Sequence, residues 1–521
     1  MKQSVGLREE VVKLSWRSNI FLLIIQIASH AKKRVRNDKH EHFFQIMNKL
    51  KIHINKIKIK EIICSLTISI LFSTKTTAQT PFSYEDFKNL VLKNHPTIKQ
   101  ANLYPREAEA EIMQAKGAYD PKLTSYFDRK AFKGEDYYNR WDSYLKIPTW
   151  SGVDFKLGYE KNSGDRLLEE ESTQLLVVGL SVPIGQGLII DARRNTLKQA
   201  RLAKNYAEAE RQKLTNSTIY YATKSYWDWW FSYQQLGLIR EGYDLADKRF
   251  VATRERARVG EQATIDSVEA KITLQDRQVA VEQAIIELQN NRLALSNFLW
   301  STNETPLELP EDAQPPLAPI RKVDETTLQS LIVQARNQHP EIQKLNVKID
   351  QLQIEERFRK EMLKPIFNAN FNLIADGFQN KAIYDYKNSF SINNHKLGFE
   401  FALPLFLRKE RGKLQQVRIK QQSTGYDLNL TRREILNDVY AAYNEVKNYE
   451  KQLKIQAEAT QNQEIMVRAE QRKFDLGEST LFLINTRESK LIEMRTKVES
   501  LKSKYEKALA NLAYMAGLTD F

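Results

Sequence analysis

The sequence predicts a mainly α-helical fold that is built twice, with a strand-rich segment inside each half. Three observations predict it: very long helical runs, short motifs that recur in the same order, and alternating segments between the helices. With 28% charged and 42% hydrophobic residues, the chain has the composition of neither a disordered chain nor a helical membrane protein.

Residues 1–78 are expected to be an N-terminal extension and signal peptide, cleaved after Ala78. A lysine-rich stretch at 49–60 and an apolar run at 62–72 follow the order of an export signal read from Met47. The residues before Met47 are either an over-long start or an unusual extension, and the sequence leaves both open.

This leader holds most of the positive charge. It contains 15 Lys and Arg against 5 Asp and Glu, so it accounts for ten of the fourteen net charges, and the near-neutral remainder argues against nucleic-acid binding. The single cysteine, Cys64, also lies in the leader, without the small preceding residue of a lipoprotein signal. A mature chain without thiols suits an oxidising compartment and excludes disulfides and cysteine catalysis.

The rest of the chain repeats itself. His-Pro at 95–96 recurs at 339–340, Val-Pro-Ile at 182–184 as Leu-Pro-Leu at 403–405, Gly-Glu at 260–261 again at 477–478, and Ala-Leu-Ser-Asn at 294–297 as Ala-Leu-Ala-Asn at 508–511. The offsets fall steadily from 244 to 214 residues. The expected organisation is a first repeat at 79–305, a proline-rich linker at 306–324 and a second repeat at 325–521.

Each repeat is expected to begin with helix, at 81–116 and 325–363, interrupted by the His-Pro pair because proline fits a first helical turn but not an interior. Strands follow, and then two long helices around a glycine break. In the first repeat these helices are expected at 189–258 and 265–300. A run of about 70 residues would be roughly 100 Å long.

The strand segments alternate apolar and polar residues, most clearly at 367–373 and 395–403. This pattern fits a membrane barrel wall and equally a half-buried soluble sheet. The first repeat has 23 more residues between its prolines, Pro96 and Pro183, than the second. The surplus, with strand-like segments at 141–148 and 153–159, predicts an additional or longer hairpin there.

These features together resemble the TolC family of outer-membrane efflux proteins. The resemblance covers about residues 81–517, and it is strengthened by Asp266 and Ala270 after Gly260 and by the segment 477–485. It implies a TolC-like homotrimer: a trimeric α-helical barrel across the periplasm, and a shared twelve-stranded transmembrane β-barrel to which each protomer gives about four strands. The implied function is a passive exit duct of a tripartite efflux or type I secretion system, opened by a periplasmic adaptor (membrane fusion protein) and an inner-membrane transporter.

The resemblance also implies contact sites at the two glycine breaks, where family tips meet the adaptor. The expected adaptor-contact residues are Val259, Gly260, Gln262, Thr264, Leu476, Gly477, Ser479 and Thr480. Ordinary turn chemistry is the alternative for these residues. Asp266 and Glu269 are candidates for lining a narrow aperture, the alternative being solvated acids near a helix N-terminus.

Other conspicuous residues favour structural roles. The cluster Tyr226, Trp227, Trp229 and Trp230 predicts packing between helices, and His95 and His339 are expected to cap turns rather than bind metal. Gly185-Gln186-Gly187 lacks the remaining residues of a phosphate loop and predicts a strand-to-helix corner.

No catalytic set or cofactor motif is recognisable, so an enzyme is not expected. The alternative function is a periplasmic coiled-coil scaffold or adaptor without a membrane barrel. Such an adaptor should carry one helical hairpin, whereas this chain carries the whole plan twice.

Overall fold

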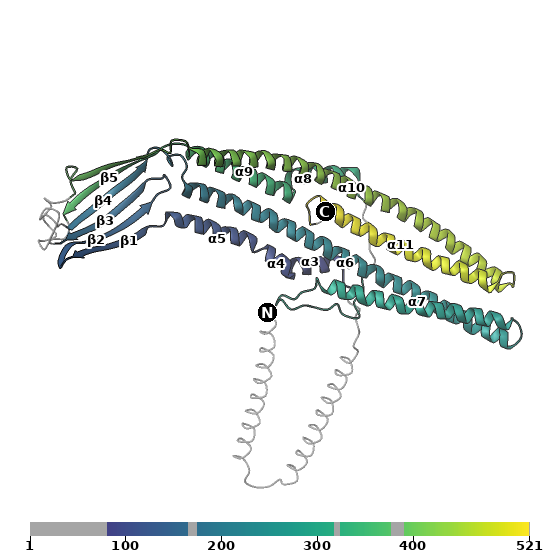
Figure 1. Cartoon of the computed structure of the whole chain (residues 1–521). Helices are drawn as coiled ribbons and strands as arrows, with labels where there is room; N and C mark the ends of the chain where they lie inside the picture. Colours follow the sequence, from purple (N-terminus) through teal and green to yellow (C-terminus); the bar gives the residue numbers. More distant parts are fainter. Residues whose placement is uncertain (1–80, 165–173, 317–322, 377–389, 520–521) are drawn as a thin grey trace, which may run out of the picture. The chain divides into compact units, whose positions relative to one another are not determined.

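The computed structural model describes residues 81–164, 174–316, 323–376 and 390–519, which all belong to the unit Gln79–Phe521 (Figure 1). Both repeats follow the predicted order of short helices, strands and two long helices. The first repeat comprises α3 (Tyr84–Asn94), α4 (Pro96–Ala101), α5 (Tyr104–Lys116), the 3₁₀ turn η1 (Gly117–Tyr119), β1 (Lys122–Phe132), β2 (Glu135–Pro148), β3 (Asp154–Ser163), β4 (Gln174–Pro183), α6 (Ala192–Arg258) and α7 (Thr264–Ser296). The second comprises α8 (Glu325–Gln338), α9 (Pro340–Glu361), β5 (Ile366–Asp376), β6 (His395–Ala402), α10 (Arg408–Asp475) and α11 (Leu481–Met515).

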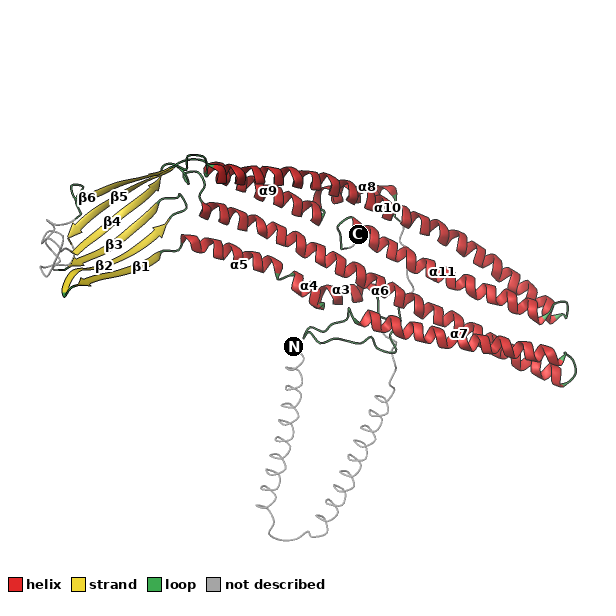
Figure 2. Ribbon diagram, viewed as in Figure 1, coloured by secondary structure: helices red, strands yellow, loops and turns green. Residues whose placement is uncertain are grey.

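The strands of both repeats form one antiparallel sheet in chain order, β1 to β6 (Figure 2). The two repeats meet between β4 and β5, where Val178 lies opposite Leu373. The described sheet has six strands, not the about four per protomer that the resemblance implied. The difference lies in the first repeat, which supplies four strands because its 23 surplus residues lengthen the chain enough for a second hairpin.

The long helices pair as antiparallel hairpins, α6 with α7 and α10 with α11, and α6 also packs against α11. At about 1.5 Å per residue the 67 residues of α6 extend roughly 100 Å. The sheet and the two glycine breaks lie at opposite ends of these helices (Figure 2).

Two buried clusters hold the short helices onto the long ones. The first-repeat cluster is aromatic, and the predicted packing role of Tyr226, Trp227, Trp229 and Trp230 is confirmed, since all four are buried with residues of α3. The Trp229 ring lies edge-on to Phe82, with ring centroids 6.3 Å apart. The second-repeat cluster is mostly aliphatic and joins α8, α9, α10 and α11.

The His-Pro pairs mark helix starts in both repeats, as expected. The Nδ1 atoms of His95 and His339 each accept a hydrogen bond from a backbone N–H two residues later, that of Thr97 or Glu341, at 3.2 Å. Burial lowers the pKa of both imidazoles, for His339 to about 4, and so keeps them neutral and able to accept this bond.

Gly185-Gln186-Gly187 forms the predicted corner between β4 and α6. Gly187 has φ +92°, a left-handed conformation that favours glycine, and Asp191 then caps α6 by accepting the Arg194 N–H at 2.8 Å.

No helix among the described residues combines the length and apolar character needed to cross a membrane. The expected leader at 1–78, with Cys64 and the cleavage site after Ala78, lies outside the described residues, as does the end of the linker at 317–322.

Candidate functional site

The two helix tips are built in the same way. At the end of α6, Gly260 has φ +83° and donates to Ala257 O at 3.2 Å, while Glu261 donates to Arg256 O at 2.9 Å. This pair of bonds is the Schellman motif, which satisfies the last carbonyls of a helix and requires a left-handed residue.

The end of α10 repeats the motif. Gly477 has φ +77° and donates to Phe474 O at 3.1 Å, and Glu478 donates to Lys473 O at 2.8 Å. The sequence match between the two breaks therefore reflects one backbone geometry present twice.

Most of the expected contact residues are accessible at these tips. Val259 is 61% exposed and Leu476 74% exposed, each just before its glycine. Thr264, the first residue of α7, is exposed, whereas Gln262 is partly buried. These two exposed apolar side chains occupy corresponding positions at the two tips.

The second tip is tied down by side chains. Thr480 caps α11 by accepting the Leu483 N–H at 3.3 Å, and the Ser479 hydroxyl donates to Glu470 at 2.5 Å. Ser479 and Thr480 therefore have structural roles, as do Gly260 and Gly477 of the two Schellman motifs.

Asp266 and Glu269 lie in the first turns of α7 and are partly buried. Ala263, at the N-cap of α7, makes no side-chain capping bond. Acidic side chains near the N-terminus of a helix interact favourably with the helix dipole. The equivalent positions of α11 carry Leu483 and Thr486, so an acidic ring would come from the first repeat alone.

A polar contact that the sequence did not reveal joins the two helical hairpins near the tips. The Arg249 guanidinium of α6 forms a bidentate ion pair with Glu488 of α11, with both N···O distances 2.5 Å, and also donates to Gln471 and Asn485. The two charged side chains are only 13% and 16% exposed. A small apolar cluster of Ala270, Leu481 and Ile484 also lies near the tips.

An exposed apolar stripe runs along α7. Its members recur every seven residues and are between 52% and 70% exposed: Ile265, Ile272, Val279, Ile286 and Leu293. A heptad repeat of apolar residues is the pattern of a helix that packs against another helix. The sequence at 265–293 contains this signal, but the packing predicted from the sequence concerned only the aromatic cluster of α6.

The sheet also leaves one face apolar and exposed. Leu123, Phe127, Phe155, Leu157 and Phe399 lie on this face and are between 43% and 76% exposed. The opposite face carries residues such as Lys146, Lys156 and Asn372. Of the two interpretations of strand alternation, this exposure favours a lipid-facing wall, because nothing in the described chain covers the apolar side.

The described residues contain no group of three or more His, Cys, Asp or Glu side chains placed to hold a metal ion.

Comparison with known proteins agrees with this geometry. Residues 331–518 match the family model "Outer membrane efflux protein". No curated protein sequence matches significantly.

Solved structures resemble the chain over most of its length. The Campylobacter jejuni CmeC outer membrane channel is 15% identical, with 83% of this chain and 85% of that chain covered and a TM-score of 0.59. The open state of the Neisseria gonorrhoeae MtrE outer membrane channel is 13% identical, with 84% and 89% covered and a TM-score of 0.58. The outer membrane protein VceC of Vibrio cholerae is 12% identical, with 83% and 95% covered and a TM-score of 0.56.

The family match and the fold together confirm the predicted TolC-like resemblance. Residues 331–518 match the outer membrane efflux protein model, and the described chain as a whole has the TolC-like fold. The solved structures that share this fold are outer membrane channels and an outer membrane protein.

Proposed function

We propose that this protein is an outer-membrane efflux channel that works as a homotrimer, a passive exit duct of a tripartite efflux or type I secretion system. Three copies would wall one tunnel across the periplasm and the outer membrane. A periplasmic adaptor and an inner-membrane transporter would open it and supply the energy. The observation that carries the proposal is the exposed heptad stripe of α7.

The stripe needs a partner because five large apolar side chains, one per heptad, stand in solvent along roughly 40 Å of helix in the single chain. In the described chain α7 packs chiefly against α6, and α10 packs against α11, α8 and α9. The outer sides of α7 and α10 are therefore the free edges of the helical layer, and α10 also exposes Ile455 and Ile465. Pairing α7 of one copy with α10 of the next would bury both.

A closed ring would also pair the edge strands of the sheet. Its edge strands β1 and β6 are unpaired on one side in the described chain. Open strand edges cannot lie in a bilayer, because their backbone groups would find no hydrogen-bond partner. Closure between copies removes these edges and leaves the apolar face toward lipid.

The tips would then gather at the periplasmic end of the tunnel. There the residues of both tips would contact the adaptor: Val259, Gly260, Gln262, Thr264, Leu476, Gly477, Ser479 and Thr480. Asp266 and Glu269 from each of the three copies would concentrate negative charge at the aperture.

The assembly is tested by placing a charge in the stripe. Val279 is 70% exposed, so Val279→Glu should leave the single chain folded but prevent trimers, measured as heat-modifiable bands from outer-membrane fractions. Lys271→Glu, at an exposed position of the same helix outside the stripe, is the matched control and should still form trimers. Trimers of Val279→Glu that resist heat as well as the control would refute the stripe as the interface. Soluble monomers of the unaltered protein in the periplasm would favour the scaffold alternative.

Adaptor contact is tested at the tips of assembled trimers. The double substitution Val259→Asp and Leu476→Asp should abolish co-purification of the adaptor and export of cargo while the trimers stay in the outer membrane. Unchanged co-purification would show that the adaptor binds elsewhere.

A further inference from the structure

The additional hairpin of the first repeat, β2 and β3, has the same two faces as the rest of the sheet. One row of apolar residues crosses five strands through successive backbone pairings: Leu123, Leu145, Leu157, Val178 and Leu373. A second row crosses β2 to β6: Ile147, Phe155, Leu180, Phe371 and Leu397. A hairpin folded into the tunnel or over its mouth would have no reason to match the lipid-facing rows of its neighbours.

The opposite face of the hairpin continues the polar side of the sheet. Lys146, Lys156, Gly179, Asn372 and Lys396 form one row across β2 to β6. Both faces of β2 and β3 are therefore those of a barrel wall, polar inside and apolar outside.

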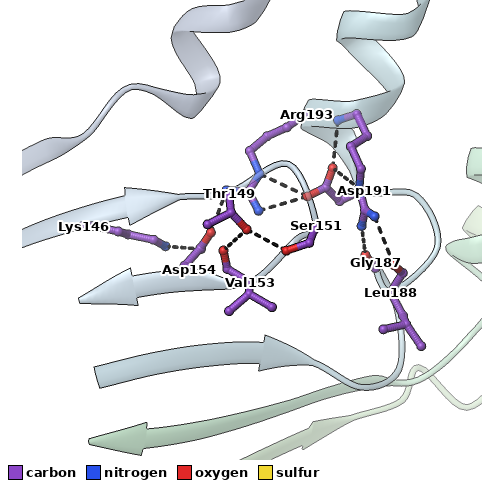
Figure 3. A network of polar contacts seen from close by, with 10 residues as sticks. Lys146, Thr149, Ser151, Val153, Asp154, Gly187, Leu188, Asp191 and Arg193 are labelled. Carbon is purple, nitrogen blue, oxygen red and sulfur yellow. Dashed lines mark hydrogen bonds and ion pairs between the residues drawn. The ribbon is translucent and has the colours of Figure 1, made fainter. Parts of the chain in front are cut away.

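The turn between β2 and β3 is fixed to the helical domain (Figure 3). Arg193, near the start of α6, donates to Asp154 at 2.7 Å and to Asp191 at 3.1 Å, and Lys146 pairs with Asp154 at 2.9 Å. Asp154 is only 17% exposed and Arg193 23% exposed. Trp150 at this turn is 82% exposed, as expected for an aromatic residue at the boundary between lipid and water. The hairpin is thus held at its turn and along both strands.

The width of the six-stranded sheet also agrees with the width of the four helices that join it. Four helices lead into and out of the sheet: α5, α6, α9 and α10. At about 10 Å per helix they span an arc of roughly 40 Å. Six strands at about 4.8 Å spacing and about 40° tilt span roughly 38 Å, whereas four strands at the same tilt span only about 25 Å.

We propose that the membrane wall of the assembled protein has eighteen strands, six from each of three copies, instead of twelve. β6 of one copy pairs with β1 of the next, and because the meander has an even number of strands, this junction is antiparallel like the others. The proposal rests on the proposed trimeric function and adds the width of its outer opening. An eighteen-stranded barrel at this tilt is about 36 Å across between backbones, against about 24 Å for twelve strands.

The position of the hairpin is tested by fluorescence quenching of single cysteines in trimers of the full chain in lipid bilayers. Cys64 lies in the expected leader, so the mature chain offers no competing thiol. A dye on Leu157→Cys, on the apolar face of β3, should be quenched by nitroxide-labelled lipids as strongly as one on Phe399→Cys of β6. A dye on Lys156→Cys, one residue away, should be quenched by iodide in water and not by the lipids.

The outcomes separate this proposal from the proposed function. Lipid quenching at both Phe399 and Leu157, together with eighteen strands in a density map of trimers in nanodiscs, supports it. Quenching at Phe399 but not at Leu157, with twelve strands in the map, overturns it and leaves the trimeric channel intact. Absence of lipid quenching at both positions overturns this proposal and the membrane-wall role of the sheet.

Discussion

The two repeats share the order of their helices and strands but differ in the side chains that fill their cores. Positions of α6 and α10 that lie 217 residues apart correspond, since this is the spacing of the two tip glycines. Trp229 corresponds to Val446, and both are 0% exposed. The first repeat fills its core with rings and the second with branched aliphatic side chains, so burial is common to both while shape is not.

The comparison also shows how each repeat holds its own first helix. In the first repeat the Tyr226 hydroxyl donates to Phe82 O at 2.9 Å, just before the N-cap of α3. In the second, Lys447 donates to Val323 O at 2.5 Å, just before the N-cap of α8. The corresponding backbone carbonyl accepts a hydrogen bond from a different residue type in each repeat. The duplication therefore preserves the contact and not the side chain.

The largest difference between the repeats should appear in their cores. Trp229→Ala should destabilise the protein by about 4 kcal/mol, because it leaves a large cavity, whereas Val446→Ala should cost about 2 kcal/mol. Thermal dissociation of purified trimers, followed on gels, measures both. Equal losses at the two positions would show that the aromatic core carries no extra stability.

The His-Pro corners are covered differently and should respond differently. In the first repeat the His95 ring stacks on Phe298 with centroids 5.7 Å apart, but in the second the backbone of Gly517 lies against His339. Gly517 has φ +78°, and an added Cβ would lie 2.8 Å from the His339 ring, so Gly517→Ala should cost about 2 kcal/mol.

Gly412→Ala is the control for that substitution. Gly412 lies inside α10 with open space around it, so alanine there should stabilise the helix by about 0.5 kcal/mol in the same thermal assay. A Gly517→Ala protein as stable as the control would mean that the corner is not tightly packed.

The ion pair near the tips joins the first repeat to the second and has no repeat-related counterpart in the described chain, because the position corresponding to Arg249 is Met466, which is 43% exposed. Arg249→Met removes the contact to Glu488 and should cost about 1 to 2 kcal/mol locally, less than a fully buried pair. With the two hairpins less firmly joined, single-channel conductance in planar bilayers should rise. Met466→Leu serves as the control and should conduct like the unaltered protein, and an unchanged conductance in Arg249→Met would exclude this pair from opening.

The smallest expected effect concerns pH. The folded-state pKa of His339 is about 4, below the usual 6.5, so between these pH values the unfolded chain binds more protons and stability falls as the pH is lowered. The loss at pH 5 should be about 1 kcal/mol, since the ring is partly exposed to solvent. His339→Asn keeps a good N-cap and should flatten this pH dependence in thermal assays at pH 7 and pH 5.

The first repeat provides the matched experiment. His95→Asn should flatten the dependence less, since the pKa of His95 is also lowered by burial but His95 is less enclosed. A pH dependence that survives both substitutions would place its origin in other groups.

Much of the fold was predictable from the sequence because it depends on local patterns. Proline after histidine and glycine after a long helical run each act over a few residues. They located the His-Pro caps, the Schellman turns at Gly260 and Gly477, and the long helices to within a few positions. The order of the repeated motifs predicted the rest of the plan.

The remainder depends on contacts between residues far apart in the chain. The sequence alone determined two copies of one helical and strand plan, with a surplus in the first. Only the tertiary structure decided that the surplus forms two further strands in register with the others, and that Arg249 meets Glu488, 239 residues away. Strand register and ion pairing are set by which surfaces meet in three dimensions, and a local pattern carries no information about the partner.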